Sequence, residues 1–121
     1  MTEPSRHRVL VIDDDEMLRE VMIETLRDDG YAVVQAGNGK EALEILEQST
    51  PELILVDVMM PVMNGYEFCK RLRKLPNGHN VPVIIMTGQG DVEAIETAFD
   101  SGATDFISKP VNWHIIGLRS G

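Results

Sequence analysis

Residues 52–57 have the sequence ELILVD, an apolar run that ends in an aspartate. It leads through the loop VMMPVMN into the helical pattern GYEFCKRLRKL of residues 65–75. An apolar run that does not alternate with polar residues predicts a strand covered on both faces. The pattern after it places Phe68, Leu72 and Leu75 on one side of a helix. This stretch therefore predicts a buried strand, an acidic residue at its end, and an amphipathic helix.

The same alternation extends in both directions along the chain. Four further apolar runs predict strands at residues 8–13, 31–36, 81–87 and, more weakly, 104–108. Amphipathic patterns predict helices between Asp15 and Gly30, at 40–48, at 91–100 and from 112 onward. The residues expected to face the core are Leu18, Val21, Met22 and Leu26 in the first helix and Val92, Ile95 and Phe99 in the fourth.

Five strands alternating with five helices predict an α/β fold with a parallel sheet and helices on both faces. Crossovers between parallel strands are almost always right-handed, which leaves few topologies. We expect a flavodoxin-like, doubly wound (βα)5 domain over residues 8–121, preceded by a flexible segment at 1–7. The fifth helical pattern is short and closes in glycine and serine. We therefore expect a truncated last helix and a chain that is a fragment lacking its output domain.

Composition narrows the class of protein. The 121 residues suit one domain, and 43% hydrophobic with 26% charged residues is a globular mixture. A net charge of -9 counts against nucleic-acid binding by this domain, which needs a basic face. Cys69 is the only cysteine, so no disulfide within the chain or zinc spacing exists. With no long apolar run or leader pattern, we expect a cytoplasmic protein that does not bind membranes.

Acidic, hydroxyl and basic residues follow four of the predicted strands. In an open parallel sheet, ligand sites lie beyond the carboxyl ends of the strands. The residues at these ends are Asp13 and Asp14, then Asp57, then Thr87, then Lys109. Each alone has a plainer explanation: a helix cap, a β-branched strand residue or a solvated loop lysine. Their combination at one edge of the sheet favours a common site.

Three carboxylates that converge would repel one another, and a cation relieves that repulsion. Oxygen ligands suit a hard ion, and Mg²⁺ prefers a few carboxylates together with phosphate and water. Asp13, Asp14 and Asp57 are therefore candidate ligands, and Lys109 adds a second positive charge. Such a site would neutralise an incoming phosphoryl group, with Asp57 as the nucleophile.

Four motifs carry a more specific resemblance. These are VIDDDE at 11–16, DVMMPVMNGYE at 57–67, IIMTG at 84–88 and DFISKP at 105–110. In order and spacing they resemble the receiver (REC) domains of two-component response regulators, from about Arg8 to the end of the chain. The resemblance implies phosphorelay signal transduction: a sensor histidine kinase or phosphotransfer protein supplies the phosphoryl group, and the domain switches an output module.

The resemblance also implies roles for single residues. Asp57 would be the phosphoacceptor and a ligand of Mg²⁺ or Mn²⁺. Asp14 would bind the ion directly and Asp13 mostly through water, with the backbone carbonyl of Met59 as a further ligand. Thr87 and Lys109 would bind phosphate oxygens. The switch would consist of Thr87 and the aromatic residue Phe106, with phosphorylation-dependent homodimerisation as one output.

Two departures from the family pattern affect these expectations. The position two residues after Asp57 is often polar and is Met59 here, whose side chain cannot orient a hydrolytic water. We therefore expect slow autodephosphorylation, although Gln89 keeps a polar group nearby. Phe106 lacks a hydroxyl, so its signal must come from ring packing. The segments RLRKLPNG and KPVNW also resemble receivers fused to diguanylate cyclase (GGDEF) modules, which suggests one class of output.

Two other functions fit the same predicted architecture. A Mg²⁺-dependent phosphohydrolase that forms an aspartyl phosphate would also use Asp57, but such enzymes usually place a second acid where Met59 stands. A flavin- or nucleotide-binding module would need a first loop rich in Gly, Ser or Thr. The loop here is Asp13–Asp14–Asp15, which repels phosphate unless a metal intervenes.

Overall fold

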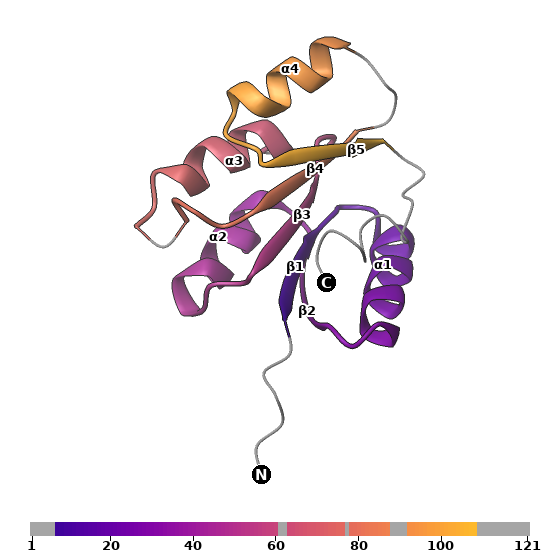
Figure 1. Ribbon diagram of the computed structural model, residues 1–121. Helices are drawn as coiled ribbons and strands as arrows, with labels where there is room; N and C mark the ends of the chain where they lie inside the picture. The colour runs from indigo at the N-terminus through magenta and orange to yellow at the C-terminus, as the bar shows by residue number, and fades with distance from the viewer. Residues whose placement is uncertain (1–6, 61–62, 77, 88–91, 109–121) are drawn as a thin grey trace.

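The computed structural model describes residues 7–60, 63–76, 78–87 and 92–108, with the backbone alone at 92–95 and 108 (Figure 1). The predicted fifth helix and Lys109 lie outside the described residues. Within them, no helix is long and apolar enough to cross a bilayer.

Five parallel strands form one sheet in the order β2-β1-β3-β4-β5. The strands are β1 (Arg8–Ile12), β2 (Ala32–Ala36), β3 (Leu53–Asp57), β4 (Val83–Thr87) and β5 (Asp105–Ser108). The helices are α1 (Glu16–Asp28), α2 (Gly39–Gln48), α3 (Gly65–Arg73) and α4 (Val92–Asp100). This is the predicted doubly wound, flavodoxin-like α/β fold. The direction of strand addition reverses between β1 and β3, which makes their carboxyl ends the expected place for a site.

The central strands are buried on both faces, as their continuous apolar runs predict. Leu10 and Ile12 of β1 pack in one core cluster with residues of α2 and α3. Val9 and Val11, which point the other way, pack in a second cluster with residues of α1. Figure 1 shows α1 on one side of the sheet and α2 and α3 on the other. Hydrophobic layers thus pack against both faces of β1, β3 and β4, and this packing fixes the positions of the strand ends.

The prediction that all strands are covered on both faces is wrong for β2. Val34 is 38% exposed and Gln35 is exposed, while Ala36 is buried. The reason is the position of β2 at the edge of the sheet, where β1 is its only described strand neighbour.

The helix starts follow the chemistry of their caps. Asp15, Asn38 and Asn64 precede α1, α2 and α3, and each side chain accepts hydrogen bonds from N–H groups of the first turn. Gly30 follows the end of α1 with φ +95°, a left-handed conformation that glycine adopts without strain. The predicted bounds of α1 are therefore confirmed.

Two predictions about buried helix faces are wrong. Leu18 and Val21 of α1 are 44% and 52% exposed, and Ile23 is buried in their place. The buried residues of α1 are Met22, Ile23 and Leu26, and Leu18 lies one turn before the first of them. Phe99 of α4 is 48% exposed, because Ala98 is the residue that enters the core.

Candidate metal centre at the carboxyl edge of the sheet

Three aspartates converge where β1 and β3 end. Asp13 and Asp14 directly follow β1, and Asp57 is the last residue of β3. One carboxylate oxygen from each lies within 4.8 Å of the others. Asp13 and Asp57 are buried and Asp14 is exposed. The convergence predicted for these three side chains is therefore observed.

The β1–α1 loop holds Asp13 through its own hydrogen bonds. Asp13 Oδ1 accepts the backbone N–H of Asp15 at 2.9 Å. Asp15 Oδ1 in turn accepts the N–H groups of Met17 and Leu18 at 3.1 and 3.2 Å, which caps α1. The carboxylate of Asp13 is thereby tied to the start of the helix, and the loop has little freedom to turn it away from Asp57.

Arg19 holds the same loop from the helix side. Its Nη1 donates to the backbone carbonyl of Asp13 at 2.6 Å, and its Nε donates to Gln35 Oε1 at 2.8 Å. The guanidinium is a rigid fork, so two contacts at once fix its place. Sequence reasoning missed Arg19, because a charged residue on the first turns of a helix is usually solvated. Its spacing of four residues after Asp15 was the available signal, since that spacing puts it on the same helix face.

The β3–α3 segment presents Asp57. Its Oδ1 accepts the backbone N–H of Met59 at 3.1 Å. The N–H of Val58 donates to the carbonyl of Met86 in β4, and the N–H of Gly65 donates to the carbonyl of Val58. A Cβ added at Gly65 would lie 2.8 Å from the carbonyl oxygen of Asp57. Glycine thus permits α3 to begin directly against the backbone of the third aspartate.

The donor set fits a hard divalent cation. All three side chains offer carboxylate oxygens, and two of them are buried, where an uncompensated charge is costly. Ligands at about 2.1 Å from Mg²⁺ lie roughly 3–4 Å from one another, close to the observed grouping. Asp13, Asp14 and Asp57 could therefore hold one such ion.

The other predicted site residues occupy neighbouring strands. Thr87 ends β4 and is buried, one residue beyond Met86, which pairs with Asp57. Phe106 lies in β5 and is half-buried, and its ring meets that of Phe99 edge-on at 5.7 Å. Met59 lies beside Asp57 with its side chain 75% exposed. Lys109 lies outside the described residues, so its contribution stays a prediction.

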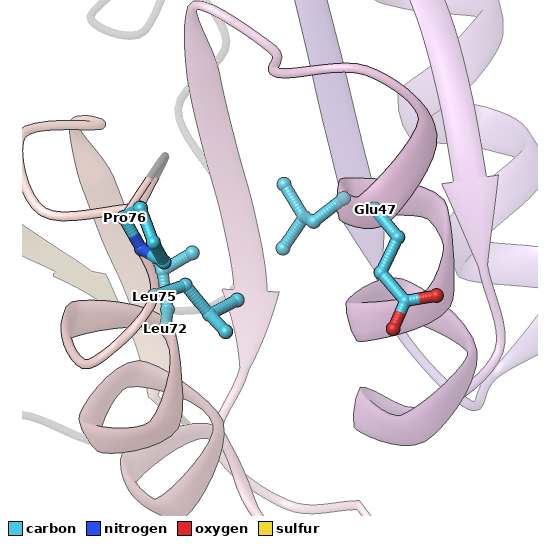
Figure 2. A pocket seen from close by; sticks show the side chains of 6 residues that line it. Glu47, Leu72, Leu75 and Pro76 are labelled. Carbon is cyan, nitrogen blue, oxygen red and sulfur yellow. The ribbon is translucent and has the colours of Figure 1, made fainter.

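A separate apolar pocket of about 150 Å³ lies between the C-terminal ends of α2 and α3 (Figure 2). Its lining residues are Leu46, Glu47, Leu72, Leu75, Pro76 and Gly78. Helices in this fold run back against the strand direction, so their C-terminal ends lie at the opposite edge of the sheet from Asp57. The pocket is therefore distinct from the acidic cluster.

Comparison with known proteins places this geometry in one family. The model of the response regulator receiver domain matches residues 9–116. A 14.6 kDa protein from the sodA1 3' region of Leptolyngbya boryana is 41% identical over 104 residues, which cover 86% of this chain and 79% of that protein. Response regulator MprA of Mycolicibacterium vanbaalenii is 37% identical over 85% of this chain. The match covers only 44% of MprA, so this chain spans less than half of that regulator.

The solved structures agree. The chemotaxis protein CheY4 of Vibrio cholerae superposes with a TM-score of 0.91 at 32% identity, covering 97% of this chain and 100% of that one. The similarity therefore extends over nearly the whole of both chains.

Proposed function

Because this chain belongs to the response regulator receiver domain family, a family of regulatory signalling domains, we propose that it accepts a phosphoryl group on Asp57. The observation that carries the proposal is the convergence of Asp57 with Asp13 and Asp14 at the junction of β1 and β3. A nucleophilic carboxylate needs a neighbouring positive charge to receive an anionic phosphoryl group, and this grouping can supply one by holding a cation.

The three carboxylates would hold Mg²⁺ or Mn²⁺, with the backbone carbonyl of Met59 as a further ligand. Asp14 is the exposed member of the cluster and would bind the ion directly, while Asp13 would do so mostly through water. When bound, the ion neutralises the charge that gathers on the carboxylates and the phosphoryl oxygens.

Other groups of this domain would orient Asp57 and bind the phosphoryl oxygens. The N–H of Met59 holds one oxygen of Asp57, which fixes the rotamer of the carboxylate. In the transfer, the bond between phosphorus and a donor histidine nitrogen breaks and a bond to an Asp57 oxygen forms. Thr87 and Lys109 would bind the phosphoryl oxygens. The domain thus acts as a phosphoacceptor that takes part in its own modification.

An apolar surface beside the acidic cluster suits the approach of a phosphodonor protein, a histidine kinase or phosphotransfer protein. Met17, Leu18 and Val21 expose 79%, 44% and 52% of their surface on the first turns of α1. Exposed apolar side chains that form a contiguous patch can mark a protein contact surface. A protein bound there would have its donor histidine near Asp14 and Asp57.

The proposed switch joins Thr87 to Phe106. A phosphoryl group adds a charge of about -1.5 to -2, which would draw the Thr87 hydroxyl inward. Phe106 packs against the exposed ring of Phe99 on α4, so movement of either ring changes the surface of α4 and β5. We propose that this surface carries the signal, through homodimerisation or an output module. The fusion to a diguanylate cyclase module, like the cytoplasmic location, stays a hypothesis about the full-length protein.

The phosphohydrolase alternative is not favoured. A hydrolase needs an acid/base group beside its nucleophile, and Met59 places a thioether there that cannot transfer a proton. We therefore propose slow autodephosphorylation in place of turnover.

Acetyl phosphate with Mg²⁺, followed by intact mass measurement, tests the proposal. We expect one added phosphoryl group in the wild-type protein and none in Asp57→Asn or in the presence of excess EDTA. Asp100→Asn, at the end of α4, is the matched control and should accept the group. Equal uptake by Asp57→Asn would refute the proposal.

A further inference from the structure

The methionines of the described residues divide into two groups. Met17 and Met59 are 79% and 75% exposed. The others, Met22, Met60, Met63 and Met86, are at most 9% exposed. Both exposed thioethers belong to the carboxyl edge of the sheet, one in the first turn of α1 and one two residues after Asp57. In the described part of the chain, the two thioethers that an oxidant can reach thus lie at the edge of the sheet that carries the acidic cluster.

The backbone fixes Met59 close to the reactive carboxylate. Its N–H donates to Asp57 Oδ1 at 3.1 Å, so its Cα cannot move far from Asp57 while that bond persists. The exposed side chain starts from this anchored point. A thioether is only a weak acceptor and donates no proton, so in its reduced form it does not hold a water molecule well.

We propose that Met59 is a peroxide-sensitive modification site whose oxidation shortens the lifetime of the phosphoryl group on Asp57. The inference rests on the function proposed above. A peroxide transfers one oxygen atom to the sulfur: the S–O bond forms, the O–O bond breaks, the sulfur is oxidised by two electrons, and hydrogen peroxide is reduced to water.

The expected effect follows from the change in polarity. A sulfoxide oxygen is a strong hydrogen-bond acceptor, and at Met59 it would be tethered next to the phosphorylated carboxylate. It can accept a hydrogen bond from a water molecule and hold that water near the phosphorus atom. Positioning of the attacking water is a large part of the barrier to hydrolysis, so the oxidised form should lose its phosphoryl group faster.

The other oxidisable side chains in the described part of the chain are protected. The four remaining methionines are buried in the core or against it. Cys69 is fully buried, and this burial raises the pKa of its thiol, which keeps the reactive thiolate scarce. Mild peroxide treatment should therefore act first on Met17 and Met59.

Peptide mass spectrometry after graded hydrogen peroxide treatment tests the modification itself. We expect sulfoxide at Met17 and Met59 to form several-fold faster than at the four buried methionines. The neighbour Met60 is the sharpest internal control, since it directly follows Met59 in the sequence but is only 9% exposed. Oxidation of Met60 as fast as Met59 would overturn the assignment.

The phosphoryl lifetime tests the consequence. Wild type, Met17→Leu and Met59→Leu are each loaded with acetyl phosphate, freed of donor, and compared with their own peroxide-treated forms. Peroxide should shorten the lifetime several-fold in wild type and Met17→Leu and leave it unchanged in Met59→Leu. Met59→Gln, which carries an amide oxygen, should lose the group faster than Met59→Leu without peroxide.

An unchanged lifetime in oxidised wild type, or an equal drop in Met59→Leu, would overturn the inference while leaving phosphorylation of Asp57 intact. Failure of the untreated wild type to take up a phosphoryl group would instead refute the proposed function, and this inference with it.

Discussion

Arg19 Nη1 donates to the backbone carbonyl of Asp13 at 2.6 Å, a contact that links α1 to the first acid of the cluster. The second contact, from Nε to Gln35, adds the edge strand β2 to the same junction. The carboxylate of Asp13 is held separately by the N–H of Asp15. The placement of the aspartates that could hold a cation therefore also involves a residue that is not one of the candidate ligands.

Replacement of Arg19 by lysine should weaken binding of the divalent cation. Lysine keeps the positive charge, so electrostatic repulsion of the cation is unchanged, but it loses the fork that grips two acceptors. A hydrogen bond from a charged group contributes about 1.5–3 kcal/mol to stability. Arg19 acts on the ion only through the position of Asp13, so part of this loss reaches the cation, and we expect a dissociation constant for Mn²⁺ roughly three- to tenfold higher. Titration calorimetry measures this constant. Arg27→Lys, in the last turn of α1, is the control, and equal affinity in both variants would contradict the account.

Gly65→Ala should disturb the backbone of Asp57. Alanine favours helices over glycine, so propensity alone predicts a gain of about 1 kcal/mol. The added Cβ would instead meet the carbonyl oxygen of Asp57 at 2.8 Å and the Cα of Val58 at 3.0 Å. We expect a net loss of about 1–3 kcal/mol in the free energy of unfolding, measured by urea denaturation.

Gly37→Ala is the matched control for this steric argument. A Cβ at Gly37 meets no atom closer than 3.6 Å, so the variant should unfold much like wild type. If Gly65→Ala were more stable than wild type, the start of α3 would accommodate a Cβ without strain, and the steric argument would be wrong.

Arg73 should prove important for stability at the far edge of the sheet. Its Nε donates to the carbonyl of Gly102, and its Nη1 donates to the carbonyls of Gly78 and Val81. Arg73→Met keeps much of the side-chain packing but leaves partly buried carbonyls without these donors. The free energy of unfolding should fall by about 1–3 kcal/mol. Arg71→Met, an exposed neighbour on the same helix, should cost far less, and equal losses would refute the argument.

The buried thiol of Cys69 should make stability sensitive to alkaline pH. Burial raises its pKa above the ordinary value of 9.0, while Arg73 and Ser101 act in the opposite direction. Because the thiol has a higher pKa in the folded protein than in the unfolded chain, it contributes to the free energy of unfolding, and this contribution is complete below pH 9.0. The contribution is lost as pH rises from 9.0 through the folded pKa, because the thiol of the unfolded chain ionises first.

The difference in unfolding free energy between wild type and Cys69→Ala isolates this group. It should be constant below pH 9.0 and shrink above it. Denaturation curves at a series of pH values measure it, and parallel profiles on both sides of pH 9.0 would contradict the assignment.

Much of the fold could be predicted because its physical signals are local. Uniformly apolar runs identified β1, β3 and β4, and cap residues such as Asp15 identified helix starts. The convergence of Asp13, Asp14 and Asp57 followed from a rule of parallel sheets, since strand ends meet at one edge. No contact had to be known in advance for that prediction.

Other features depend on tertiary contacts that sequence patterns do not encode. The helical period groups Leu18 and Val21 with Met22, but only the docking of α1 decides that Ile23 is buried instead. The exposure of Val34 required the strand order, which puts β2 at an edge. The hydrogen bond from Arg19 to the carbonyl of Asp13 joins a helix to a loop, and it uses a type of side chain that commonly faces water. Such features become visible only when the elements are packed together.

The most direct test of the central claim is to locate the phosphoryl group chemically. The protein is treated with acetyl phosphate and Mg²⁺ and then with borohydride, which reduces an aspartyl phosphate to homoserine, and the peptides are sequenced by mass spectrometry. We predict homoserine at position 57 alone, and none when EDTA is present from the start. Homoserine at another aspartate, with position 57 unchanged, would contradict the account.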